Sequence, residues 1–151
     1  MFLSKQRFSE VIESTPLVSI DLVIEDESGQ ILLGERLNRP AQGFWFVPGG
    51  RILKDEKLED AFARLTLEEL GHEFQFSQAI LLGPYTHLYG DNVFGNAFTT
   101  HYVAIAYKLV VIRSELNLPT NVQHSRYHWY KQDELLTSDK VHIHTKWYFK
   151  K

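Results

Sequence analysis

The stretch from Gly49 to Gly71 constrains the fold and chemistry of this chain more than any other. A Gly49-Gly50 turn leads through acidic residues into a helical pattern that carries an arginine and two adjacent glutamates and stops at a glycine. Carboxylates supply the hard oxygen ligands that Mg²⁺ prefers, and arginines meet phosphate oxygens with a two-pronged donor. The combination therefore indicates a metal bound to a diphosphate.

The sequence predicts both ends of the helix in this stretch and the face that it turns to the core. Asp55 is the expected N-cap and Gly71 the expected C′ glycine. Glu69 lies one turn beyond Leu65, where a carboxylate is costly to bury unless it is paired or bound to metal. The alternative to a metal-binding helix is a capped surface helix with an isolated ion pair and no function. Leu58, Ala61, Phe62 and Leu65 form the apolar stripe of this helix. As a member of that stripe, Leu65 is also expected to have a packing role in the core.

The rest of the chain alternates strand and loop patterns. Helices are expected over 2–13 and in the last twenty residues, where one would contain Trp147 and Phe149. Polar loops are expected over 38–43, 90–97 and 117–125. We therefore predict an α+β fold with mixed strands around the helix, forming one domain over 1–151. The expected strands span 17–24, 31–34, 44–47, 79–89, 98–111 and 127–130.

Composition excludes several classes of protein. A hydrophobic content of 44% is enough for one core, and the net charge of −3 without a basic tract argues against nucleic-acid binding. The absence of cysteine excludes disulfides and thiolate metal sites, which suits a cytoplasmic protein. No apolar run approaches a membrane span, and Lys5 and Arg7 interrupt the N-terminus, so we expect neither a membrane segment nor a signal peptide.

The spacing within 50–71 is close to the Nudix box. That motif reads Gly, five residues, Glu, seven residues, Arg-Glu, an aliphatic residue, any residue, Glu-Glu, any residue, Gly. Leu65 stands where the family has Glu, and Thr66 where it has an aliphatic residue. The first departure removes one carboxylate and argues against the usual Nudix chemistry, in which water attacks phosphorus. Six residues fall in place: Gly50, Glu56, Arg64, Glu68, Glu69 and Gly71.

This departure is shared with one branch of the family. The chain resembles the GDP-mannose mannosyl hydrolases, which carry the Arg-Leu variant, over nearly its whole length. The resemblance implies a Nudix α/β/α sandwich with a mixed β-sheet and a catalytic loop and helix. It also implies a homodimer in bacterial surface-polysaccharide metabolism. Its specific stretches are 1–3, 14–19, 38–43, 45–51 and 98–103, which include Ser-Thr-Pro-Leu-Val-Ser and Phe-Thr-Thr-His-Tyr-Val.

The activity implied by the resemblance is hydrolysis of GDP-mannose, and also of GDP-glucose, to GDP and free sugar. Water attacks C1 of the sugar with inversion. The cofactor is Mg²⁺, with Mn²⁺ as an alternative, held by the Gly49 carbonyl, Glu69 and Gln123. His124 is the implied general base, which suits an imidazole that titrates near neutral pH. A loop with Gln123 and His124 would act as a lid that brings ligand and base together.

The resemblance also assigns supporting roles. It places Arg36 on the substrate, and it suggests that Arg51 and Arg64 serve the diphosphate or orient the carboxylates. Taken alone, these arginines also read as surface cations. Among seven histidines, His142 and His144 are expected at the surface of a terminal helix and not as a metal pair. The resemblance assigns supporting roles in the reaction to Asp21, His87 and Tyr102. It assigns contacts with the nucleotide sugar to Phe2, Leu3 and Phe8. From the sequence alone, the last three would be interpreted as core or dimer contacts.

Two alternative functions stay open. One is a Nudix diphosphatase that cleaves a phosphorus–oxygen bond, and Leu65 argues against it. The other is a non-catalytic module that binds a nucleotide sugar, and intact Glu56, Glu68 and Glu69 argue against it. Neither the preferred sugar nor a metal contact of Glu56 and Glu68 follows from the sequence.

Overall fold

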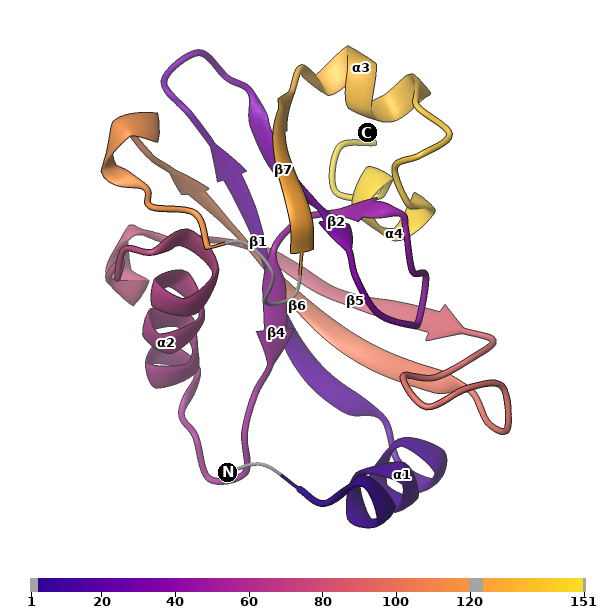
Figure 1. Cartoon of the computed structure of the whole chain (residues 1–151). Helices are drawn as coiled ribbons and strands as arrows, with labels where there is room; N and C mark the ends of the chain where they lie inside the picture. The colour runs from indigo at the N-terminus through magenta and orange to yellow at the C-terminus, as the bar shows by residue number, and fades with distance from the viewer. Residues whose placement is uncertain (1–2, 120–123, 151) are drawn as a thin grey trace.

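A mixed β-sheet forms the centre of the molecule (Figure 1). The computed structural model describes residues 3–119 and 124–150, and side chains over 3–119 and 126–150. The strands run in the order β3-β2-β1-β6-β5, with β4 also paired to β1 and β7 to β2. β1 is parallel to β6 and the other pairs are antiparallel. Their bounds are β1 Leu17–Glu25, β2 Ile31–Arg36, β3 Trp45–Phe46, β4 Gly49–Arg51, β5 Ile80–Tyr89, β6 Thr100–Val110 and β7 His124–Tyr130.

β1 organises this sheet by changing neighbours along its length. It pairs with β2 at Glu25 and with β4 over Ser19 to Asp21, while β6 lies along its whole other side. Most of its side chains are buried, on both faces of the sheet, as expected for a β-branched and apolar run at the centre of a sheet. The change of neighbour places the two glycines of β4 directly beside Asp21.

Helices cover the two faces of the sheet. α2 (Leu58–Leu70) packs on one face, while α3 (Gln132–Thr137) and α4 (Ile143–Lys146) lie on the other, as Figure 1 shows. α1 (Lys5–Ser14) lies at one end, and two 3₁₀ turns span Phe76–Gln78 and Arg113–Glu115. Among the described residues, no helix has the length and apolar character needed to cross a membrane. The predicted α+β class with a mixed sheet is confirmed.

Several predicted boundaries were wrong for local reasons. The helix after the glycine turn has Lys57 as its N-cap and not Asp55, whose φ of 65° places it in a left-handed turn. β4 was missed because glycine disfavours strands. The terminal helix is two short helices, with Trp147 at the end of α4 and Phe149 beyond it. β7 starts at His124 and not at 127, so His124 is the first residue of a strand and not part of the predicted polar loop.

Candidate active site

A cavity of about 280 Å³ opens where α1, β1, β2, β4, β5 and β6 meet. Sheet register explains why residues far apart in sequence gather there. Asp21 is the partner of Gly49 across β1 and β4, and His87 is the partner of Tyr102 across β5 and β6. Many of the residues predicted for the site lie together in its wall: Phe8, Asp21, Arg36, Gly49, Arg51, His87 and Tyr102.

The acidic group in the cavity wall is Asp21, whose side chain keeps 18% of its surface exposed. Burial raises its carboxyl pKa to about 6, although a hydrogen bond from the Tyr148 hydroxyl and the charge of Arg36 act to lower it. The same Asp21 oxygen lies 4.0 Å from Nδ1 of His87. Asp21 and His87 therefore form one polar group at the cavity wall, together with a tyrosine that the sequence did not indicate.

A stack of aromatic rings supports that wall. His87 stacks on His144 with ring centroids 4.3 Å apart and planes 7° apart. His142 stacks on Phe46 at 4.6 Å and 20°, and it lies 4.4 Å from His144. Burial lowers the pKa of His87 to about 3 and of His142 and His144 to about 4, so all three rings are neutral at pH 7.

The expectation that His142 and His144 lie at the surface was therefore wrong for the second residue. His144 is only 5% exposed, and its backbone N–H donates to Nδ1 of His142 at 3.1 Å. α4 turns both rings inward, toward the sheet. That they form no metal pair stays a prediction.

The corner between Gly49 and Glu69 offers oxygen donors for a hard cation. The Gly49 N–H donates to Oε1 of Glu69 at 3.3 Å, and Glu69 is 2% exposed. Burial raises the Glu69 pKa to about 7, and Glu68 adds to the rise, while the Gly49 N–H and Arg36 oppose it. A buried carboxylate next to the backbone of Gly49 brings together the kinds of oxygen ligand that Mg²⁺ accepts. The third predicted ligand, Gln123, lies outside the described residues.

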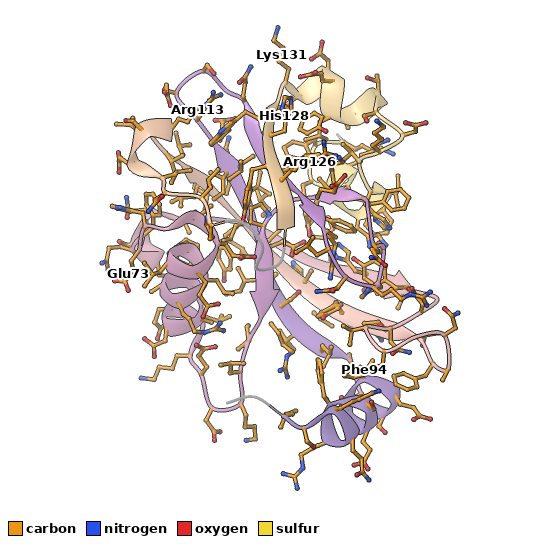
Figure 2. All side chains as sticks on the ribbon, viewed as in Figure 1. Glu73, Phe94, Arg113, Arg126, His128 and Lys131 are labelled. Carbon is orange, nitrogen blue, oxygen red and sulfur yellow. The ribbon has the colours of Figure 1, made fainter. Side chains whose placement is uncertain are left out.

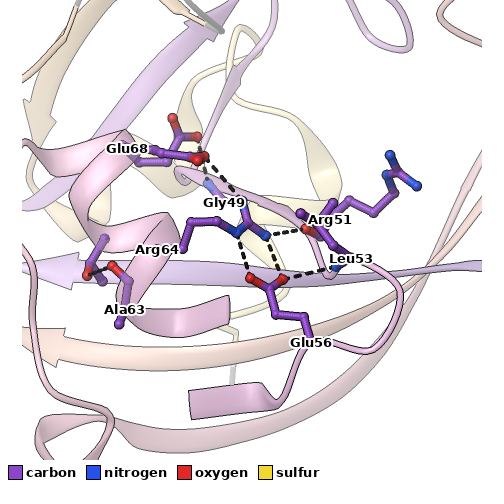
Figure 3. Close-up of polar contacts among 9 residues, drawn as sticks. Gly49, Arg51, Leu53, Glu56, Ala63, Arg64 and Glu68 are labelled. Atoms are coloured by element: carbon purple, nitrogen blue, oxygen red, sulfur yellow. Dashed lines mark hydrogen bonds and ion pairs between the residues drawn. The ribbon is translucent and has the colours of Figure 1, made fainter. Parts of the chain in front are cut away.

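Arg64 ties this helix to the strand beside it (Figure 3). Its Nε and Nη2 donate to the two oxygens of Glu56 at 2.7 and 2.9 Å, and Nη2 also donates to the Arg51 carbonyl at 2.9 Å. Nη1 donates to Glu68 at 3.2 Å. Arg64 is not among the described residues of the cavity wall. Of its two predicted roles, these contacts match the orientation of carboxylates, and direct substrate binding stays a prediction.

Leu65 fills the position where the family has a carboxylate. It is 1% exposed and belongs to the core cluster around Phe62 and Tyr107. A Cβ placed on Gly50 would meet Cδ2 of Leu65 at 2.5 Å, so the Leu65 side chain packs directly against Gly50. The predicted packing role of Leu65 is confirmed, and its side chain makes an apolar contact beside Gly50, next to the corner between Gly49 and Glu69.

Two arginines line the cavity near aromatic rings. The Arg51 guanidinium lies 4.5 Å from the ring centre of Phe8, and that of Arg36 lies 5.2 Å from Phe46. Both charges act to lower the pKa of Tyr102, although burial outweighs them and raises it. Phe94, labelled near α1 in Figure 2, packs edge-on against Phe8 at 6.0 Å. Positive charge therefore lies along an aromatic wall, and arginines of this kind can bind phosphate oxygens.

The remaining predicted residues are placed only in part. Leu3 is half-buried and does not appear among the described residues of the cavity wall. Phe2 lies outside the described residues. The backbone of His124 pairs with Arg36 across β2 and β7, but its side chain is outside the described part of the chain. The predicted lid over 117–125 therefore stays a prediction.

Comparison with known proteins gives consistent results. Residues 15–150 match the family model described as NUDIX domain. The low-salt glycan biosynthesis protein Agl8 of Haloferax volcanii is 40% identical over 116 residues, which cover 77% of this chain and 71% of that protein. A MutT protein from Methanosarcina mazei Go1 superposes with a TM-score of 0.71 at 23% identity, over 90% of this chain and 92% of its own. A MutT NUDIX hydrolase from Burkholderia pseudomallei superposes with a TM-score of 0.71 at 27% sequence identity, over 89% of this chain and 96% of that chain.

Proposed function

The chain belongs to the Nudix hydrolase family, and from that premise we propose that it hydrolyses GDP-α-D-mannose, and also GDP-glucose, to GDP and free sugar. The observation that carries the proposal is the position of Leu65, buried against Gly50 where the family has a carboxylate. A metal corner lacking that carboxylate is less suited to activating water against phosphorus. The name of the Haloferax relative, which refers to glycan biosynthesis, supports a substrate that carries a sugar.

Nudix hydrolases generally use a divalent cation. Glu69 and the Gly49 carbonyl, with Gln123, would hold Mg²⁺, which when bound neutralises charge on the diphosphate. Arg36 and Arg51 line the cavity and would stabilise the negative charge that develops on departing GDP. Arg64 would act indirectly, because its hydrogen bonds hold Glu56, Glu68 and the carbonyl of Arg51 in place.

The proposed reaction is a direct displacement at C1 of the sugar. The water oxygen forms a bond to C1 while the bond from C1 to the phosphate oxygen breaks, and GDP leaves with the electron pair. The water proton passes to His124, whose backbone lies beside that of Arg36. Asp21, His87 and Tyr102 would contact the sugar side of the substrate. Displacement from one face inverts the anomeric centre, as in inverting glycoside hydrolysis.

Product identity tests this proposal against both alternatives. The protein is incubated with GDP-mannose and Mg²⁺, and the products are identified by phosphorus and proton NMR. GDP plus mannose supports the proposal. GMP plus mannose 1-phosphate would show a diphosphatase, and a protein that binds GDP-mannose without turnover would be a binding module.

The predicted partners remain predictions with simple tests. A homodimer is expected from the resemblance, and several apolar side chains on the edge strand β5 are exposed, with Ile80, Leu81 and Leu88 at 58, 59 and 63%. Light scattering at micromolar concentration distinguishes a dimer from a monomer. The expected cytoplasmic location and the absence of nucleic-acid binding are likewise still predictions.

A further inference from the structure

A tyrosine from the C-terminal segment joins two groups of the cavity wall. The Tyr148 hydroxyl donates a hydrogen bond to Oδ2 of Asp21 and lies 3.3 Å from Nε2 of His87. Asp21 and His87 line the cavity, whereas Tyr148 is not among its described wall residues. The three residues come from β1, β5 and the turn after α4, so only the folded chain brings them together.

The hydrogen-bond pattern fixes where the protons lie. A phenol has one proton, and Tyr148 gives it to Asp21, so the phenol oxygen is left to accept. The His87 ring therefore donates from Nε2, which makes it the neutral tautomer protonated at that nitrogen. Burial supports this arrangement, because it lowers the His87 pKa and raises the Tyr148 pKa.

The segment that carries Tyr148 is hydrogen-bonded to β3 and to Val47, just before β4. The backbone of Trp45 donates to Lys140 at 2.9 Å, and the N–H of His142 donates back to Trp45 at 3.0 Å. The Val47 N–H donates to the Thr145 hydroxyl at 3.2 Å. The segment that leads to Tyr148 is thus held to the chain just before Pro48 and Gly49.

We propose that Tyr148 is a positioning residue of the active site, whose hydroxyl holds the Asp21 carboxylate and the His87 ring in the orientations presented to the sugar. The inference rests on the proposed function, since the sugar is the group that these side chains would meet. Oδ1 of Asp21, the oxygen not bonded to Tyr148, points toward Gly49, where an added Cβ would lie 3.0 Å from it. Loss of the hydroxyl would free the carboxylate to rotate away from this orientation.

The test replaces only the hydroxyl. Tyr148→Phe keeps the ring, which packs edge-on against Tyr85 at 4.7 Å. We expect kcat for GDP-mannose to fall about 10- to 100-fold, as for the loss of other groups that orient a catalytic side chain, with little change in KM. Tyr85→Phe removes a hydroxyl from the neighbouring ring and is expected to retain wild-type kcat. Wild-type kcat in Tyr148→Phe, or an equal loss in both variants, would overturn the proposal.

A second measurement does not depend on the substrate. Long-range ¹H–¹⁵N spectra report the tautomer of each histidine, and a His87→Gln spectrum assigns the His87 signals. We expect His87 to be protonated at Nε2 in the wild type, with its ring nitrogen shifts altered in Tyr148→Phe. Protonation at Nδ1 in the wild type would overturn the proposal whatever the variants do. A wild type without turnover would refute the proposed function and leave this test valid.

Discussion

Leu65→Glu restores the family motif and probes why this chain departs from it. Leu65 is 1% exposed in the core, so the change removes an apolar side chain worth about 2 kcal/mol of burial and places a carboxyl there. Glu69, four residues further along the same helix, shows the effect of such burial, since its pKa rises from 4.5 to about 7. The new carboxyl should show a rise of similar size.

A raised carboxyl pKa makes the stability of the variant depend on pH. The folded state then holds its proton more tightly than the unfolded state, so stability is lost as pH rises from about 4.5 toward 7. The carboxyl alone would cost about 1 kcal/mol at pH 5 and about 3 kcal/mol at pH 7. With the lost apolar burial, the total near neutral pH is about 5 kcal/mol, comparable with the whole stability of a small domain.

Urea unfolding of Leu65→Glu, Leu65→Gln and wild type at pH 5 and pH 7 measures this effect. Leu65→Gln loses the same apolar contact without an ionisable group, so its difference from wild type should not change with pH. We also expect Leu65→Glu not to release GMP from GDP-mannose. A variant that is as stable as wild type at pH 7, or that produces GMP, would refute the reasoning.

Two further substitutions test the ligand and the base. Glu69→Gln should weaken Mg²⁺ binding in titration calorimetry and remove its increase with pH up to about 7, because the carboxylate must lose its proton to bind. Glu59→Gln, exposed on the same helix, is the control, and wild-type affinity in Glu69→Gln would exclude it as a ligand. His124→Gln should lower turnover by about 10²–10⁴-fold and abolish the rise of rate with pH near neutrality, with exposed His72→Gln as its control. An unchanged pH profile would exclude His124 as the base.

The sequence predicted those helices and strands whose formation depends on neighbouring residues along the chain. The β1 run and the helix that ends at Gly71 are examples. Gly71 adopts φ of 70°, and an added Cβ would lie 1.9 Å from the Asn117 carbonyl oxygen, so a glycine is required there. The start of this helix was wrong because Glu56 accepts from the Leu53 N–H at 3.0 Å and binds Arg64, which extends the turn.

The candidate site was predictable where a motif or a resemblance carried it, and not where it depends on contacts between distant segments. Asp21, Arg36 and His87 were predicted and line one cavity. Tyr148 was not, because its partner Asp21 is 127 residues away and nothing local marks a tyrosine in that turn. The buried stack of His144 on His87 was missed for the same reason, since it requires α4 to fold back on β5.

The position of bond cleavage tests the central claim most directly. Hydrolysis of GDP-mannose in ¹⁸O-water, followed by mass spectrometry of both products, shows which atom water attacks. The account predicts label in mannose and none in GDP, with the β-anomer as the first sugar product. Label in a phosphate product would contradict attack at carbon and make the protein a Nudix diphosphatase.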